Sequence, residues 1–156
     1  MIFQIRRAVA EDAAGAASVM CRSIEVLCVA DHRNDKSLLQ DWTGNKTEKE
    51  VLQWIQDPEN WPAVAIEAGQ VVGFAMLNEQ GVLLLLYVLP KAVGQGVGAE
   101  LLAAIESHGR EAGLGKLQLE STLTARKFYK KHGFSDVKIT ADVAGELRCY
   151  PMEKQL

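Results

Sequence analysis

The spacing of apolar residues along this chain predicts short strands interspersed with amphipathic helices. Segments with alternating or continuous apolar residues, bounded by turn residues, are typical of strands. They lie at residues 2–8, 63–67, 71–77, 82–88, 117–121, 134–139 and 146–152. Segments in which apolar residues recur every three or four positions are typical of helices. They lie at residues 10–29, 47–56, 97–112 and 124–132.

Local signals sharpen the ends of these elements. Thr47 followed by Glu50 fits a capping box that begins the second helix, and Asp57-Pro58 ends it. Residues 31–45 are mostly polar, so we expect an irregular connection there. The run at residues 82–88 is the most apolar of the chain, which predicts a central strand covered on both faces.

The order of these elements predicts an α/β fold built on a mixed sheet. Helices 97–112 and 124–132 act as crossovers between strands, which requires some parallel pairing. A chain of 156 residues is long enough to bury one sizeable core. We therefore expect one domain over residues 1–156, with about seven strands flanked by four helices.

A glycine-rich run, Val93-Gly94-Gln95-Gly96-Val97-Gly98, separates a predicted strand from a predicted helix. The glycines leave backbone amides free to curl around an anion, and the helix start adds its dipole and unpaired donors. This combination suits a pyrophosphate, although a flexible loop has the same composition. No Gly-Lys-Ser/Thr follows, which excludes a Walker A loop. The run also lies past the middle of the chain, unlike a Rossmann loop.

The composition narrows the classes of function. Apolar residues make up 48% of the chain, as in a globular protein, and the net charge of −3 gives no electrostatic case for nucleic acid or an acidic membrane. Cys21, Cys28 and Cys149 lack the spacing of metal ligands, so we expect reduced thiols and no metal. A signal-peptide core and a bilayer-spanning stretch are both missing, so we expect a cytoplasmic protein.

Three motifs, in this order, resemble the GCN5-related N-acetyltransferase (GNAT) family over nearly the whole chain. The first is the strand end Leu86-Tyr87-Val88-Leu89-Pro90. The second is Gly94-x-Gly96-x-Gly98-x-x-Leu101-Leu102, which is similar to the acetyl-CoA signature of that family. The third is Ala125-x-x-Phe128-Tyr129-x-x-His132-Gly133-Phe134, which is similar to another family segment.

The resemblance implies acetyl-CoA as co-substrate and a sheet that is splayed between its fourth and fifth strands. It implies that the amides of residues 93–98 bind the pyrophosphate, and that backbone groups near Tyr87 and Val88 pair with the pantetheine. The implied pyrophosphate-binding residues are Val93, Gly94, Gln95, Gly96, Val97 and Gly98. Val93 departs from the family pattern, which favours Arg or Gln at this position, because its side chain has no hydrogen-bond donor.

The resemblance also implies candidate catalytic residues. Tyr129 would protonate the leaving thiolate, although an aromatic residue in the core would give the same pattern. Glu120 is the candidate general base for the amine on a different ground, since strand alternation places it opposite Leu117 and Leu119, where it can face the cleft; a solvated or structural carboxylate is the alternative interpretation. Glu79 is a weaker candidate because it lies in a predicted turn.

The segment between the first two helices is where this family varies its acceptor site. His32 and Trp42 are the candidate substrate-binding residues, and Asp31 and Trp54 lie near them in the sequence. A surface hydrogen-bonded pair would equally explain His32 beside Asp31, and core packing would explain the tryptophans.

We therefore expect an N-acetyltransferase that transfers an acetyl group to a primary amine of a small molecule or peptide by direct attack in a ternary complex. A non-catalytic acyl-CoA-binding or sensing module is the alternative. A nucleotide-binding domain is disfavoured by the late position of the glycine run. The identity of the amine and the oligomeric state stay open, a homodimer included.

Overall fold

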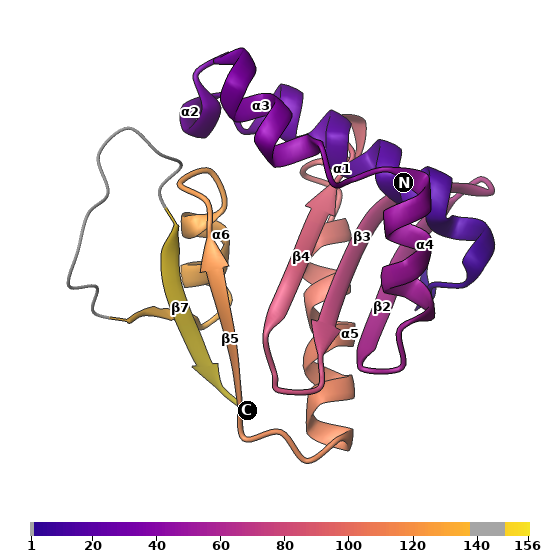
Figure 1. Ribbon diagram of the computed structural model, residues 1–156. Coiled ribbons are helices and arrows are strands. Elements are labelled where there is room, and N and C mark those ends of the chain that lie inside the picture. The colour runs from indigo at the N-terminus through magenta and orange to yellow at the C-terminus, as the bar shows by residue number, and fades with distance from the viewer. Residues whose placement is uncertain (1, 138–148) are drawn as a thin grey trace.

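Two antiparallel sheets stand side by side in the computed structural model, which describes residues 2–137 and 149–156. The first sheet has the order β1-β2-β3-β4 and the second has the order β5-β7-β6. The strands are β1 (Gln4–Arg7), β2 (Asn60–Glu67), β3 (Gln70–Asn78), β4 (Leu83–Val88), β5 (Lys116–Ser121), β6 (Ser135–Asp136) and β7 (Tyr150–Gln155). Figure 1 shows β4 and β5 running in the same direction and diverging along their length.

Helices cover both faces of the first sheet (Figure 1). One face carries the 3-10 turn η1 (Ala10–Asp12), α1 (Ala13–Leu27), α2 (Val29–His32), α3 (Lys36–Thr43) and α4 (Glu48–Gln56). The other face carries α5 (Val97–Glu111), which follows the 3-10 turn η2 (Pro90–Ala92). The short helix α6 (Arg126–Lys131) follows β5.

The core has two parts because the first sheet is covered on both sides. Alternate residues of a strand point to opposite faces, so Ala63 and Ala65 of β2 pack with α5 residues such as Leu101. Val64, between them, packs with Met20 of α1 on the other face. This explains why β2 and β3 are apolar throughout instead of alternating.

The mixed fold with about seven strands is confirmed, and so is the splay between the fourth and fifth strands. Thr47 is confirmed as the N-cap of α4, since its hydroxyl accepts from the Glu50 N–H at 3.2 Å, but the described hydrogen bonds do not include the return bond from the Glu50 side chain that would complete a capping box. In the part of the chain that is described, parallel pairing is limited to a single bridge between Val82 and Gln118. The last two predicted strands, 134–139 and 146–152, fall partly outside the described residues.

The prediction of an irregular connection over residues 31–45 was wrong. Asp35 begins the helix α3 there, since its carboxylate accepts from the N–H groups of Ser37 and Leu38 at 2.9 and 3.1 Å. The expected helix over residues 10–29 is divided, because the backbone of Cys28 leaves the helical region between α1 and α2. The structure therefore has more helices than the four expected.

Of the prediction that residues 82–88 form a central strand covered on both faces, the covered faces are confirmed, since Leu86 packs against one core cluster and Leu85 against the other, but the central position was wrong. β4 pairs with β3 along one edge only, and Leu84 is 44% exposed while residues 85–88 are half-buried. The apolar side chains of β4 also line the space that opens between the two sheets, so they contact a cavity as well as the core.

The carboxylate of Asp12 joins the start of the first helical segment to β1. It is buried, and it accepts from the Arg6 guanidinium at 2.7 and 2.9 Å and from the Val9 N–H at 2.8 Å. Burial by itself would raise the pKa of this carboxyl, but the bonds from Arg6 and Val9 outweigh it and the pKa is lowered.

We expect Asp12→Ala to lower the free energy of unfolding by about 1–3 kcal/mol, the scale of hydrogen bonds to a charged group. Because the folded pKa lies below the unfolded value, the ionised form stabilises the fold above about pH 4 and this stabilisation is lost as the pH falls through the folded pKa. Denaturant titrations at several pH values measure this difference. Glu11→Ala, at an exposed neighbour, serves as the control and should change stability little.

Candidate functional site

Two cavities lie along the gap between β4 and β5. The first, of about 560 Å³, is bounded by β4, the glycine run, the start of α5, α6 and the end of α1. The second, of about 770 Å³, is bounded by β4, β5, β7 and Trp42 of α3. Six residues line both cavities: Leu83, Leu84, Tyr87, Glu120, Ser121 and Thr122. The two cavities therefore meet in the gap.

The glycine run wraps around the end of the first cavity. Gly94 and Gly96 have φ values of +80° and +88°, which side chains disfavour, and the space beside them is open. The Gly96 carbonyl accepts the first intrahelical bond, from the Glu100 N–H at 3.0 Å. The amides of residues 97–99 precede that bond, so the first turn of α5 presents free donors beside the cavity.

The side chains of the predicted pyrophosphate-binding residues lie in three different environments. The Val93 side chain is 51% exposed and lines the first cavity. Gln95 is exposed but does not line the cavity, and the Val97 side chain is buried in the core. Any anion here would therefore meet backbone amides, with no cationic side chain from this run.

Gly98 brings α6 close to the start of α5. A Cβ at Gly98 would lie 3.4 Å from the Phe128 ring and 3.7 Å from the Val88 side chain. Phe128 therefore packs against the first turn of α5, where it forms one wall of the first cavity.

The edge of β4 that faces the gap is free beyond the Val82–Gln118 bridge in the described structure. Tyr87 and Val88 pair with Phe74 and Gly73 of β3 on the other edge. The free edge lines the first cavity, so its backbone groups are available to an extended ligand.

The Tyr87 side chain has a structural contact as well. Its hydroxyl accepts from the Trp42 indole N–H at 3.1 Å, which joins β4 to α3 across the top of the sheet. Burial raises the pKa of Tyr87, so the phenol stays protonated at neutral pH.

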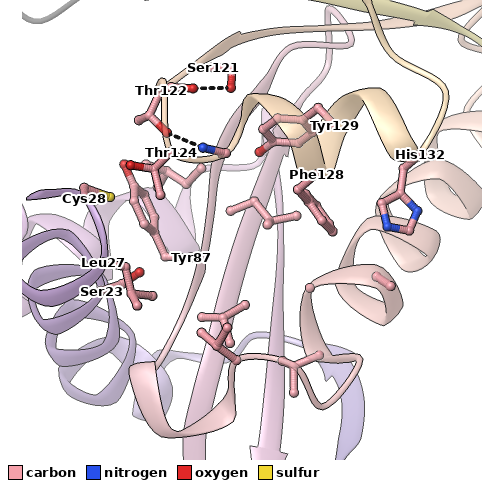
Figure 2. Close-up of a pocket in the computed structure, with 18 of the residues that line it drawn as sticks. Ser23, Leu27, Cys28, Tyr87, Ser121, Thr122, Thr124, Phe128, Tyr129 and His132 are labelled. Atoms are coloured by element: carbon pink, nitrogen blue, oxygen red, sulfur yellow. Dashed lines mark hydrogen bonds between the residues drawn. The ribbon is translucent and has the colours of Figure 1, made fainter. Parts of the chain in front are cut away.

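Tyr129 lies on α6 with its ring buried between Phe128 and Phe134, whose ring centroids are 5.3 and 5.5 Å away. Figure 2 shows its hydroxyl turned toward the side of the cavity that holds Thr124 and Tyr87. Burial raises its pKa, so the hydroxyl can donate a proton or a hydrogen bond but does not act as a base at neutral pH.

Glu120 lies on β5 between the buried residues Leu119 and Ser121, so its side chain points the other way, toward the gap. It lines both cavities, and it has no hydrogen bond or ion pair with any residue that the structure describes. Glu79 lies in the turn after β3, contacts only the neighbouring Gln80 at 3.4 Å, and lines neither cavity. The geometry favours Glu120 over Glu79.

The structure brings Trp42 but not His32 to a cavity. Trp42 lines the second cavity, while Trp54 packs against the core and lines neither. His32 is fully buried, with Nε2 2.8 Å from the Ile24 carbonyl oxygen and Nδ1 accepting from the Asn34 N–H at 3.0 Å. Both ring nitrogens of His32 are hydrogen-bonded inside the fold, so His32 is a structural residue. The structure therefore does not support it as a substrate-binding residue.

The sequence analysis missed the residues around the loop before α6. Thr122, Thr124 and Cys28 line the first cavity, and Asp31 hydrogen-bonds to the loop. Burial raises the pKa of the Cys28 thiol to about 12, which keeps it protonated. The contact of Asp31 joins residues far apart in the sequence, so no local pattern indicates it.

Neither a metal site nor a membrane span is found in the described ranges. There is no group of three or more His, Cys, Asp or Glu side chains that could hold a metal ion in residues 2–137 and 149–156. In the same ranges, no helix has the length and apolar character needed to cross a membrane.

Comparison with known proteins gives the family. The profile of the acetyltransferase (GNAT) domain matches residues 28–156. The chain is 34% identical over 93 residues to an IAA acetyltransferase of Azospirillum brasilense, and 32% identical over 92 residues to an aminoalkylphosphonate N-acetyltransferase of Salmonella typhimurium. These matches cover 54% and 51% of this chain, and 61% and 60% of the relatives. The chain thus spans about three-fifths of the length of these relatives.

Solved structures agree with this. A GCN5-related N-acetyltransferase from Rhodopseudomonas palustris has a TM-score of 0.85 and 28% identity, with 100% of this chain and 99% of that chain covered. The PaiA N-acetyltransferase of Thermoplasma acidophilum, in complex with coenzyme A, shares the fold with a TM-score of 0.81, 21% identity and full coverage of both chains at 100%. The chain belongs to the GNAT acetyltransferase family.

Proposed function

We propose that residues 1–156 form one acetyltransferase domain that transfers the acetyl group of acetyl-CoA to a primary amine of a small molecule or peptide. The observation that carries the proposal is the meeting of two cavities at the free edge of β4. One substrate in each cavity would then meet the other in the gap and react with it directly in a ternary complex.

The first cavity suits acetyl-CoA. Amides of the glycine run and of the first turn of α5 would hold the pyrophosphate, helped by the positive end of the helix dipole. The free edge at Tyr87 and Val88 would pair with the pantetheine amides as an added strand does. The coenzyme A complex of the similarly folded PaiA protein supports this choice of ligand.

The second cavity would bring the amine to the thioester. Glu120 would take the ammonium proton, directly or through a water, so that the nitrogen can attack the thioester carbonyl carbon. The new C–N bond forms, the nitrogen releases its second proton to solvent, and the C–S bond breaks. Tyr129 would give its proton to the departing thiolate and regain one from solvent.

The charge of the second cavity favours amines without an acidic group. Its described lining includes Asp31, Glu120 and Glu153, against one cation, Lys116, which lies 3.7 Å from Glu153. The Trp42 ring and apolar side chains form the rest of the wall. A phosphonate or carboxylate would be repelled here, unlike the substrate class named for the Salmonella relative.

Matched amines test both parts of the proposal. We expect 2-phenylethylamine to be acetylated with a kcat/KM at least about tenfold above that of phenylalanine, which differs from it by a carboxylate. Thiol release measures both rates. A preference for phenylalanine would contradict the acceptor class. Coenzyme A binding with no turnover of any amine would favour the acyl-CoA-binding module, and no binding would exclude both.

Replacing Gly96 tests the place of the pyrophosphate. Gly96→Val puts a β-branched residue at positive φ and a side chain among the amides, so we expect the Kd for coenzyme A to rise at least about tenfold. Gly113→Val is the matched control, because Gly113 has φ +81° and open space beside it at the far end of α5. Both variants should lose similar thermal stability, and only Gly96→Val should lose affinity by calorimetry. Equal affinities of the two variants for coenzyme A would show that the pyrophosphate binds elsewhere.

Removing the Tyr129 hydroxyl tests the proposed acid. Tyr129→Phe keeps the packed ring, so we expect unchanged coenzyme A affinity and a kcat lowered at least about tenfold where chemistry limits turnover. Steady-state kinetics with saturating acetyl-CoA measure the change. A kcat equal to that of the wild type would reassign Tyr129 to packing. Phe128→Leu, beside it in the same wall, controls for altered packing.

A further inference from the structure

The carboxylate of Asp31 spans the open end of the gap between the two sheets. Its Oδ1 accepts from the Leu123 N–H at 2.7 Å, and its Oδ2 accepts from the Thr124 N–H at 3.2 Å and from the Thr124 hydroxyl. Figure 1 shows α2, which carries Asp31, beside the loop that precedes α6. Both oxygens are therefore used to join the first helical layer to the second sheet.

The support on the Asp31 side is rigid. The neighbouring His32 is fully buried and fixed through both ring nitrogens, and its ring meets the Trp42 ring edge-on at 6.3 Å. The next turn is held by Asp35, which caps α3. The segment that carries Asp31 is therefore held by contacts with both α1 and α3.

The loop on the other side leads directly into α6. The Thr122 hydroxyl accepts from the Ala125 N–H at 3.0 Å, and the Ala125 carbonyl accepts from the Tyr129 N–H at 3.1 Å. A displacement of the loop would therefore be passed to the helix turn that carries the Tyr129 hydroxyl.

The two ends of the gap are held by different contacts. At the closed end, the Gln118 N–H donates to the Gly81 carbonyl at 2.9 Å. At the open end, the hydrogen bonds described between α2 and the loop at residues 122–125 all have Asp31 as the acceptor. Packing of Phe128 near Gly98 adds an apolar contact on one side only.

We propose that Asp31 is a positioning residue that sets the width of the gap at its open end and thereby places the Tyr129 hydroxyl relative to the free edge of β4. This rests on the proposed acetyl transfer. The glycine run sits on the β4–α5 side of the gap, so its affinity for coenzyme A should not depend on Asp31. The proposal predicts a loss of kcat without a loss of cofactor binding.

Asp31→Ala tests this with two independent measurements. We expect the Leu123 and Thr124 amides to exchange hydrogen at least about tenfold faster, because their acceptor is gone. We expect kcat at saturating acetyl-CoA to fall at least about tenfold, since small misplacement of a reacting group is costly. The Kd for coenzyme A should stay within about twofold of the wild type. Asp41→Ala is the control, because Asp41 is an exposed carboxylate on α3 that makes no described hydrogen bond or ion pair.

Substitution of Thr124 tests the same contact from the other side. Thr124→Val removes the hydroxyl donor and should lower kcat in part, while Thr124→Ser keeps the donor and should recover it. Thr124→Val should have little further effect in the Asp31→Ala background, because contacting residues are not additive. Asp31→Asn keeps the side-chain volume and one acceptor oxygen, and it takes the place of Asp31→Ala if that variant does not fold.

Each remaining outcome decides the question. Faster exchange with a wild-type kcat would overturn the positioning role, and so would unchanged exchange. If coenzyme A affinity and kcat fell together, Asp31 would be needed for the fold as a whole, and the positioning role would again be overturned. A wild-type protein that neither binds coenzyme A nor acetylates an amine would overturn the proposed function itself, which the variants cannot do.

Discussion

The structure depends on the close approach of the chain at Gly81 to the beginning of β5. A Cβ at this position would lie 2.9 Å from the Lys116 carbonyl oxygen, and the backbone φ of +87° also favours glycine. This contact allows the bridge between Val82 and Gln118 and fixes the closed end of the gap. Beyond it, β4 and β5 pair with different partners and separate, which opens the two cavities.

The separation leaves hydrogen-bonding capacity where a ligand can use it. In the described residues, no buried side-chain nitrogen or oxygen lacks a partner. The free edge of β4 and the first turn of α5, in contrast, present backbone groups to the first cavity. Unpaired backbone groups are costly when water is excluded, so a ligand with amides and an anion would be held by groups that the fold cannot otherwise satisfy.

The sequence predicted the parts of the fold that depend on local order. The strands of the first sheet, the glycine run before α5 and the cap at Thr47 follow from periodicity and from residue types a few positions apart. Helix α3 was missed because it is short and mostly polar, although Leu38, Leu39 and Trp42 have helical spacing and Asp35 caps it. The central position of β4 was wrong because apolar composition indicates covered faces and says nothing of whether both edges are paired.

The site was predicted unevenly for a related reason. Glu120 and Trp42 line the cavities. Strand alternation indicated this for Glu120, and the position of the family's variable segment indicated it for Trp42. The burial of His32 and the contact of Asp31 with Thr124 depend on chain segments far apart in the sequence, which no spacing rule detects. Long-range contacts of this kind are where sequence patterns stop being informative.

The two cavities are built from parts of unequal stability. The first is bounded by β4 and α5, whose residues belong to the main apolar core. The second is bounded on one side by α3, which has no buried residue and contacts mainly α1. Substitutions in α3 therefore affect few core contacts, whereas those at the start of α5 disturb the packing of the sheet. A fold of this kind can alter the cavity wall formed by α3 while the wall that faces the glycine run stays constant.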